Sequence, residues 1–306
     1  MSSHIRTILI TGAGGAAGRS LCRQLRLLRN AHLRIIATDV REVETCADIF
    51  LTGPAADSPE LIDFLRSVIA SYDVDLVLPT VQDELPVVTA AAPELGNRVI
   101  LSDPVSVDVC HDKLLTALRL EDQGIAVPWT RAGSQTPVDY PLVVKPRVSH
   151  GGRGVVVVDT AEELPELDES VIIQGFAGGV EFCPQVYRSP IDDSVTTVML
   201  QKMKLRDGRI GNADSVLRIA RSLAPDVAEL AEATVVALEL YGPVDLDIRR
   251  GRDGTPVVLD VNARFGPHSA CAPELLRQLL ADAALVVPEA PEAPTAAFTT
   301  TALQAS

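Results

Sequence analysis

The chain is short of cysteine and of basic residues, and both shortages exclude classes of protein. Its 306 residues include five cysteines, and 27 lysines and arginines face 41 aspartates and glutamates, for a net charge of −14. The cysteines are odd in number and scattered, so neither a disulfide framework nor a zinc site is expected. A protein this acidic lacks the basic surface that binds nucleic acid. We therefore expect reduced thiols and no nucleic-acid partner.

Long apolar runs and targeting signals are also lacking. No hydrophobic stretch has the length that spans a bilayer. Arg6 interrupts the first residues, and Ile8–Thr11 leads straight into a glycine turn, which is unlike a signal peptide. The composition, 47% hydrophobic and 22% charged, is ordinary for a globular protein, and the length suits two domains. We expect a cytoplasmic protein with no membrane partner.

A glycine-rich turn follows the first apolar segment. Thr7–Ile10 predicts a strand, Gly12–Gly18 contains four glycines, and leucines at helical spacing come next. A second strand, Arg34–Thr38, ends at Asp39, where a dinucleotide-binding fold keeps its ribose-binding acid. Amide groups at the helix start can hold an anion. The alternative is that the glycines only allow the helix to pack tightly on the strand.

The following residues alternate between helix and strand patterns. Residues 59–72 have helical spacing, whereas 74–78 and 99–101 are short apolar strands. This alternation predicts a parallel sheet. The pattern stops near residue 103, so no second mononucleotide-binding half follows, which weakens the dinucleotide interpretation.

A second glycine-rich segment lies between two predicted strands. Residues 107–123 are expected to be helical, and 141–146 form a strand that ends at Lys145-Pro146. The loop Gly151–Gly154 then leads into a strand over 155–158. Backbone amides in such a loop can cradle phosphate while the lysine supplies charge. The spacing is not that of a P-loop, and a plain glycine hairpin with a surface lysine is the alternative.

A hairpin near the C-terminal end gathers oxygen ligands. Val244–Ile248 and Pro256–Val261 predict two strands joined by a turn at Asp253-Gly254. Alternation places a set of polar side chains on one face, and these are Asp245, Asp247, Asp260, Asn262 and Arg264. Carboxylate and amide oxygens bind Mg²⁺ together with substrate phosphate. The alternative is an ordinary antiparallel pair with a solvated polar face.

These segments, in this order, resemble the ATP-grasp superfamily. The carbamoyl phosphate synthase large-subunit branch is similar in ILITGAGGAAGRSL, IIATDV and DVDLVLPTVQDEL, and in the joining segment LSDPVSVDVCHDKLLTALRLEDQGIAVPWT. The resemblance implies an α/β (α+β) fold, with a Rossmann-like pre-ATP-grasp domain over 1–104 and a two-lobed ATP-grasp domain over 105–287. It places a glycine-lid lobe at about 125–175 and a metal-binding lobe at about 176–287. An Ala/Pro/Thr-rich tail, 288–306, would follow.

The resemblance also implies roles for individual residues. Lys113 and Lys145 would contact the phosphates of ATP, and Glu181 would accept hydrogen bonds from the ribose. The lid glycines would be Gly151, Gly152 and Gly154, and the adenine would be lined by Gln174, Gly175, Phe176 and Ala177. Arg264 would act with Lys145 in catalysis by steadying the transferring phosphate. The Mg²⁺ ligands would be Asp247, Asp260 and Asn262, and Asp245 need not be a ligand.

Three positions depart from the family pattern. Gly175 stands where members often carry an acid, and Asp247 stands where Gln or Glu is usual. Asn262-Ala263-Arg264 replaces Asn-Pro-Arg. None of these changes removes a needed charge, so we expect a working ATP site.

The resemblance implies an ATP-grasp carboxylate–amine ligase. Its substrate carboxylate would become an acyl phosphate that an amine converts to an amide, with ADP and phosphate released. ATP and Mg²⁺ would be required, with two ions expected and Mn²⁺ a substitute. The partners would be small carboxylates and amines, such as amino acids, peptides or natural-product intermediates, and a homodimer is an option. Further substrate contacts could come from His150, Arg218 or Arg221.

Two other functions compete with the ligase. One is a nucleotide-binding ATP-grasp protein without turnover, which loss of the hairpin ligands would favour. The other is an NAD(P)-dependent oxidoreductase, which predicts a catalytic Tyr-x-x-x-Lys pair that the sequence lacks.

Overall fold

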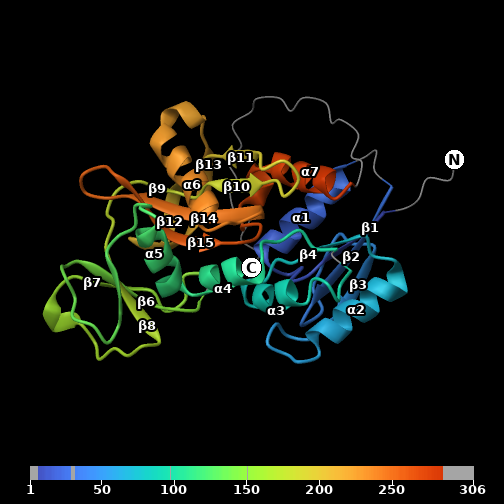
Figure 1. The fold of residues 1–306 in the computed structure, drawn as a ribbon, viewed down its shortest axis with the longest axis horizontal. Helices are drawn as coiled ribbons and strands as arrows, with labels where there is room; N and C mark the ends of the chain where they lie inside the picture. Colours follow the sequence, from blue (N-terminus) through green and yellow to red (C-terminus); the bar gives the residue numbers. More distant parts are fainter. Residues whose placement is uncertain (1–5, 29–31, 97, 150, 285–306) are drawn as a thin grey trace.

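Three β-sheets organise the described part of the chain (Figure 1). The computed structural model describes residues 6–28, 32–96, 98–149 and 151–284, so His150 and the tail over 288–306 lie outside it. The first sheet is parallel and has the order β3-β2-β1-β4. Its strands are β1 (Arg6–Ile10), β2 (Leu33–Asp39), β3 (Ile49–Thr52) and β4 (Leu76–Leu78).

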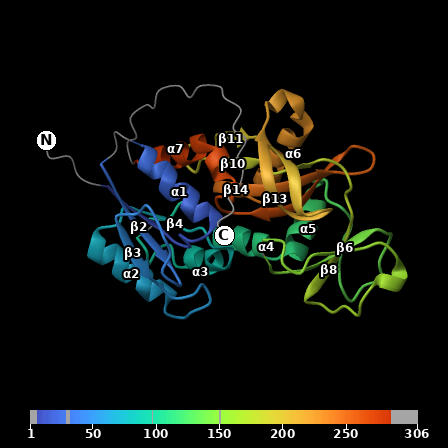
Figure 2. The same cartoon turned by 180° about the vertical axis from the view of Figure 1, so that it is seen from behind.

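Helices cover both faces of this parallel sheet, because successive strand side chains point to opposite faces. The isoleucines of β1 pack in one cluster with leucines of α1 (Ala16–Leu27) and α7 (Pro273–Asp282). Leu9, between those isoleucines, packs with α2 (Leu61–Tyr72). Figures 1 and 2 show α1 and α7 on one side of the sheet and α2 on the other. The predicted parallel α/β arrangement is confirmed.

The remaining two sheets are formed by residues after 129. The second is antiparallel, with the order β5-β8-β6-β7, and consists of β5 (Thr130–Ala132), β6 (Leu142–Pro146), β7 (Val156–Val158) and β8 (Val171–Gly175). The third has seven strands, with β14 pairing to β9, β10 and β15. Its strands are β9 (Glu181–Phe182), β10 (Gln185–Arg188), β11 (Val195–Val198), β12 (Leu200–Asp207), β13 (Ile210–Arg218), β14 (Gly242–Arg250) and β15 (Pro256–Asn262).

The other helices are short connections or pack on the third sheet. In particular, α6 packs its buried valines and alanines in one cluster with β14. These helices are η1 (Gln82–Glu84), α3 (Leu85–Ala90), α4 (Pro104–His111), α5 (Lys113–Asp122), η2 (Ala161–Glu163), η3 (Arg221–Leu223), α6 (Pro225–Ala237) and η4 (Ser269–Cys271). No helix in the described ranges has both the length and the apolar character that crossing a membrane requires.

Two local predictions are wrong. The expected strand over 99–101 is reduced to a single bridge with β4. The helix expected over 107–123 is broken at Asp112, which accepts hydrogen bonds from the first turn of α5 and pairs with Arg147 at 2.5 Å. A carboxylate that caps a helix in this way marks a new N-terminus. Arg147, 35 residues away, helps to fix this break, so the local spacing could not indicate it.

Candidate active site

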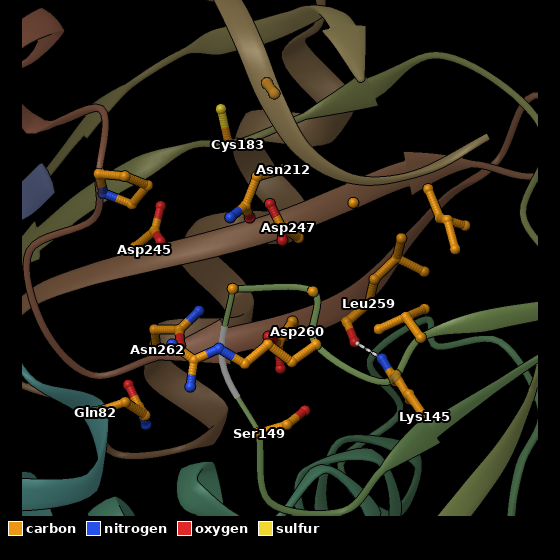
Figure 3. A pocket seen from close by; sticks show the side chains of 18 of the residues that line it. Gln82, Lys145, Ser149, Cys183, Asn212, Asp245, Asp247, Leu259, Asp260 and Asn262 are labelled. Atoms are coloured by element: carbon orange, nitrogen blue, oxygen red, sulfur yellow. Dashed lines mark hydrogen bonds between the residues drawn. The ribbon is translucent and has the colours of Figure 1, made fainter. Parts of the chain in front are cut away.

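A pocket of about 470 Å³ lies where the three sheets meet. Its walls come from the loops at the ends of β1, β2 and β4, from β6 and the glycine loop after it, from β8, and from the β12–β13 and β14–β15 hairpins. Every residue that the sequence assigned to ATP, metal or catalysis lines this pocket, apart from Gly154 in the loop beside it. Figure 3 shows acidic side chains of the β14–β15 hairpin and Lys145 in the same pocket.

The β14–β15 hairpin brings the acids of its two strands opposite one another. Asp247 lies opposite Asp260, and Asp245 lies opposite Asn262. A β-bulge follows Asp247, where the register shifts before Ile248. Because directly opposed residues on adjacent strands have neighbouring side chains, the oxygens of Asp247 and Asp260 can share one cation.

Two lysines approach Asp260, one from the start of α5 and one from β6. Lys113 Nζ lies 3.4 Å from Asp260 Oδ1 and donates to the carbonyl of Ser149 at 2.7 Å. Lys145 Nζ donates to the carbonyl of Leu259 at 2.9 Å. Burial lowers the pKa of Lys145 to about 8, and the carboxylate of Asp260 opposes this shift. A lysine with so few contacts in a dry pocket is suited to bind an incoming anion.

Lys202 on β12 completes the charged cluster, and the sequence analysis did not identify it. Its Nζ lies 2.5 Å from Glu181 and 2.7 Å from Asp247. Burial disfavours its charge, but the two carboxylates outweigh burial and raise its pKa. Simple alternation would give Lys202 and Lys204 one face, yet Lys204 is exposed because the β12–β13 register shifts between them. Because of this bulge, strand alternation alone does not predict that Lys202 is the lysine that faces the pocket.

Glu181 is a buried acid between two basic side chains. Besides Lys202, the guanidinium of Arg249 lies 3.6 Å from it. Burial raises the pKa of Glu181 and outweighs the attraction of Lys202. Arg249 also stacks on the ring of Phe176, with its guanidinium carbon 5.1 Å from the ring centroid. This places Glu181 next to the segment predicted to line the adenine.

Arg264 is held by polar groups of the hairpin. Its Nη2 donates to Asn262 Oδ1 at 3.1 Å, and Nη1 donates to the Phe265 carbonyl at 2.9 Å. Asp245 Oδ2 lies 3.8 Å from Nη1. Burial, followed by the neighbouring charge of Asp247, raises the pKa of Asp245 to about 6. Asp245 thus supports Arg264 from the side.

The glycine lid loop, residues 151–154, requires glycine for its backbone. Gly151, Gly152 and Gly154 have φ angles of 70°, 74° and 73°, which side chains strongly disfavour. A Cβ at Gly152 would lie 3.4 Å from Gly211 Cα, so the loop rests against the start of β13. The loop therefore forms one wall of the pocket, in a backbone conformation that few residues other than glycine adopt.

The segment Gln174–Ala177, at the end of β8, forms another part of the pocket wall. Gln174 Nε2 donates to Thr130 Oγ1 at 3.0 Å, which fixes the end of β8. A Cβ at Gly175 would lie 2.8 Å from the indole nitrogen of Trp129. The departure from the family pattern at this position has a physical reason, because Trp129 fills the space that an acidic side chain would need.

The residues present fit a nucleotide phosphate with Mg²⁺. No group of three or more His, Cys, Asp or Glu side chains in the described ranges could hold a metal by itself. Asp247 and Asp260 supply two carboxylates and Asn262 an amide oxygen, which is the sparse donor set that Mg²⁺ uses when phosphate completes its shell. Arg264 Nε is buried and has no hydrogen-bond partner among the described residues, so it can donate to an anion in the pocket.

The first glycine turn, residues 11–18, does not hold a free ribose-binding acid. Asp39 Oδ2 accepts a hydrogen bond from the Gly14 amide at 2.8 Å. A Cβ at Gly14 would lie 3.0 Å from that same oxygen, so Asp39 covers the turn. The turn still contributes Gly12 and Gly15 to the pocket.

Two of the three residues considered for further substrate contacts, Arg218 and Arg221, do not line the pocket. Arg218 pairs with Glu274, and Arg221 pairs with Glu232, both on exposed surface away from the pocket. His150 lies outside the described residues. The pocket instead contains Gln82 and His268, which the sequence analysis did not select.

Comparisons with known proteins agree with this geometry. Residues 110–267, 158 of the 306, match the family model described as an ATP-grasp domain. A D-alanine–D-alanine ligase of Clostridium botulinum (strain Eklund 17B) is 29% identical over 53% of this chain and 60% of its own length. A carbamoyl phosphate synthase large chain of Xylella fastidiosa (strain 9a5c) is 20% identical over 88% of this chain and 28% of its own length.

Solved structures show the same fold at low identity. An L-amino acid ligase from Bacillus licheniformis superposes with a TM-score of 0.72 and 21% identity, over 87% of this chain and 68% of that one. An N5-carboxyaminoimidazole synthetase from Staphylococcus aureus complexed with ADP gives a TM-score of 0.73 and 15% identity, over 92% and 78%.

Proposed function

Because the chain belongs to the ATP-grasp domain family, we propose that it is an ATP-dependent carboxylate–amine ligase. A substrate carboxylate attacks the γ-phosphate of ATP and forms an acyl phosphate and ADP. An amine then displaces phosphate and forms an amide. We propose amino acids, peptides or natural-product intermediates as the substrates. D-alanine and L-amino acids, which appear in the names of two similar ligases, belong to the first of these classes.

The charge arrangement around Asp260 supports this proposal most directly. Lys113 and Lys145 approach one side of the acidic hairpin, and Arg264 lies at its end. Phosphoryl transfer needs positioning and neutralisation of charge more than covalent help from the protein. Cations on both sides of a carboxylate pair can hold a phosphate chain between them.

We propose that Asp247, Asp260 and Asn262 hold Mg²⁺, which neutralises the charge on the phosphates. Lys202 bridges Asp247 and Glu181 and is positioned to contact phosphate oxygens as well. The glycine lid loop excludes water, which would otherwise hydrolyse an acyl phosphate. Glu181 and the segment Gln174–Ala177 hold the nucleoside. A second ion, or Mn²⁺ in its place, fits the same donor set.

The same proposal extends to organisation and location. We assign residues 1–104 to a domain that helps to bind the second substrate and 105–287 to the ATP-grasp domain. We also expect a cytoplasmic enzyme and keep a homodimer as an expectation. The chain spans 60% of the length of the D-alanine–D-alanine ligase of Clostridium botulinum. The activity of the whole protein is therefore stated as a proposal.

The test is ADP formation that depends on both a carboxylate and an amine. Purified protein with MgATP is incubated with pools of amino acids and dipeptides, and amide products are identified by mass spectrometry. We expect Asp260→Asn to lower turnover at least about a hundredfold, because a metal ligand and a partner of Lys113 change together. Asp253→Asn, in the exposed turn of the same hairpin, is the matched control.

Two outcomes would overturn the ligase. Tight MgATP binding with no turnover on any pool would identify a nucleotide-binding protein. A change in nicotinamide absorbance with no ADP formation would identify an oxidoreductase.

A further inference from the structure

A buried amide in the pocket wall has no protein partner. Gln82, the first residue of η1, is 7% exposed and lines the pocket. Its Oε1 is buried and accepts no hydrogen bond from the described residues. An acceptor left unsatisfied in this way destabilises a folded protein, so its position calls for an explanation.

The turn that carries Gln82 is rigidly attached to β1. Glu84 Oε1 accepts hydrogen bonds from the amides of Thr80 and Val81, each at 3.0 Å, and from the hydroxyl of Thr11. Thr80 Oγ1 in turn donates to the Thr11 carbonyl at 2.8 Å. These bonds position the backbone on both sides of Gln82. The backbone that carries Gln82 is therefore held in place beside the pocket.

A second orphan group lines the same pocket. Arg264 Nε is a buried donor without a partner. In the view of Figure 3, Gln82 and Asn262 lie on one side of the pocket, and Lys145 and Leu259 lie on the other. Asn262 accepts from Arg264. The acceptor Gln82 Oε1 and the donor Arg264 Nε therefore lie toward the end of the pocket away from Lys145, and neither has a hydrogen-bond partner among the described residues.

We propose that Gln82 selects a carboxylate substrate that carries an α-ammonium group. The inference rests on the proposed ligase function. The carboxylate that becomes phosphorylated accepts from Arg264 Nε, and the ammonium on the adjacent carbon donates to Gln82 Oε1. Asp39, in the same wall, supplies negative charge that favours an ammonium over a hydroxyl. The substrate to be activated is thus a free α-amino acid.

The test compares amino acids with analogues that lack only the nitrogen. The probes are L-alanine, L-leucine, L-phenylalanine and L-glutamate against propionate, 4-methylpentanoate, 3-phenylpropionate and glutarate. The readout is kcat/KM for carboxylate-dependent ADP formation with saturating MgATP and hydroxylamine as the accepting amine. We expect the best amino acid to exceed its partner by about tenfold to a hundredfold, the worth of one hydrogen bond to a charged group.

Gln82→Leu removes the acceptor and keeps most of the volume. We expect this variant to bring the ratio close to one, through a loss of kcat/KM for the amino acids. Gln24→Leu is the matched control, because Gln24 Oε1 is also buried without a partner but does not line the pocket. The control should keep the wild-type ratio.

Three results would overturn the inference. A wild-type preference that Gln82→Leu leaves intact removes Gln82 as the selector. Efficient turnover of the nitrogen-free analogues, with none of the amino acids, removes the substrate class but keeps the ligase. No ADP formation with any of the eight carboxylates removes the selector together with the ligase activity on these substrates.

Discussion

Two glycine-rich turns border the pocket, and they need glycine for different physical reasons. In the first glycine turn, a Cβ at Gly18 would lie 2.5 Å from the Gly12 carbonyl oxygen and 2.8 Å from Ala13 Cα. In the glycine lid loop, Gly151 has only one atom within 4 Å of its would-be Cβ, at 3.8 Å, but its φ is 70°. Gly18 of the first turn therefore excludes a side chain by contact, and Gly151 of the lid excludes one by backbone conformation. Gly12, with a φ of 57°, and Gly154, whose Cβ would lie 2.9 Å from Pro146 Cγ, combine the two reasons.

Each turn also adjoins one buried ionisable group. The two groups differ in how many hydrogen bonds the protein makes with them. Glu84 is fully engaged with backbone and hydroxyl donors beneath the first turn. Lys145, at the base of the lid, makes a single hydrogen bond to a carbonyl. A satisfied group holds structure, whereas a barely satisfied one is available to a ligand. Stability should therefore depend on the first turn, and function on the second.

The largest effect is expected for Gly18→Ala. The added Cβ meets backbone atoms of residues 12 and 13, which cannot move without displacing α1 from β1. We expect the free energy of unfolding to fall by about 3 kcal/mol, in the range for an overpacked site. Urea denaturation followed by circular dichroism measures it. Gly124→Ala is a control for the loss of glycine alone, because no atom lies within 4 Å there. Equal losses in both variants would contradict a contact mechanism.

A pH-dependent effect nearly as large is expected for Glu84→Gln. Burial raises the pKa of Glu84 to about 7 from an ordinary 4.5. Between these values the folded state keeps a proton that the unfolded state has released. The free energy of unfolding therefore falls as pH rises through this window, by about 3 kcal/mol in total. Above pH 7 this penalty is fully present.

Glu84→Gln should remove that slope, because an amide does not ionise in this range, and its oxygen can still accept the three bonds that Oε1 accepts. The measurement is the difference in unfolding free energy between variant and wild type from pH 4.5 to 8. We expect the variant to gain relative stability as pH rises. A difference that stays constant across the range would show that Glu84 does not titrate there.

The acidic hairpin could be predicted from sequence because its information is local. Strand alternation and the Asp-Gly turn predict the two strands and a shared face for the acids on each strand, and the bulge after Asp247 then sets Asp247 opposite Asp260. The glycine lid and Lys145 follow from similarly short patterns. The first sheet was predictable for the same reason, since α/β alternation repeats along the chain.

The remainder of the site depends on contacts between distant segments. Lys202 reaches Glu181 and Asp247 because a bulge redirects β12, and no spacing rule signals that bulge. The helix break at Asp112 depends on Arg147, the residue that follows β6. Gln82 becomes notable only when its lack of a partner is known. Sequence patterns predict helices and strands, whereas tertiary contacts decide which polar side chains are left without a hydrogen-bond partner.

A smaller effect is expected in nucleotide binding at alkaline pH. Burial lowers the pKa of Lys145 to about 8 from an ordinary 10.5, so its positive charge is lost as pH rises through 8. The Kd for MgATP should rise by up to about tenfold per pH unit above that value. Isothermal titration calorimetry from pH 7 to 9.5 measures this rise. Lys145→Arg stays charged throughout, so an unchanged alkaline slope in that variant would assign the titration to another group.

The smallest effect, and the sharpest contrast with Gly18, is expected for Gly152→Ala. There is room for the Cβ, 3.4 Å from Gly211 Cα, but a φ of 74° strains an alanine by about 1 kcal/mol. The folded protein should thus lose only about that much stability. Gly254→Ala, with a φ of 85° in the exposed hairpin turn and no atom within 4 Å, carries the same strain without bordering the pocket. We expect equal stability losses in the two variants, measured by urea denaturation, and a loss of about tenfold in ATP turnover only for Gly152→Ala. Equal turnover in both would mean that the lid conformation does not limit the reaction, and the functional half of the contrast between the turns would then be wrong.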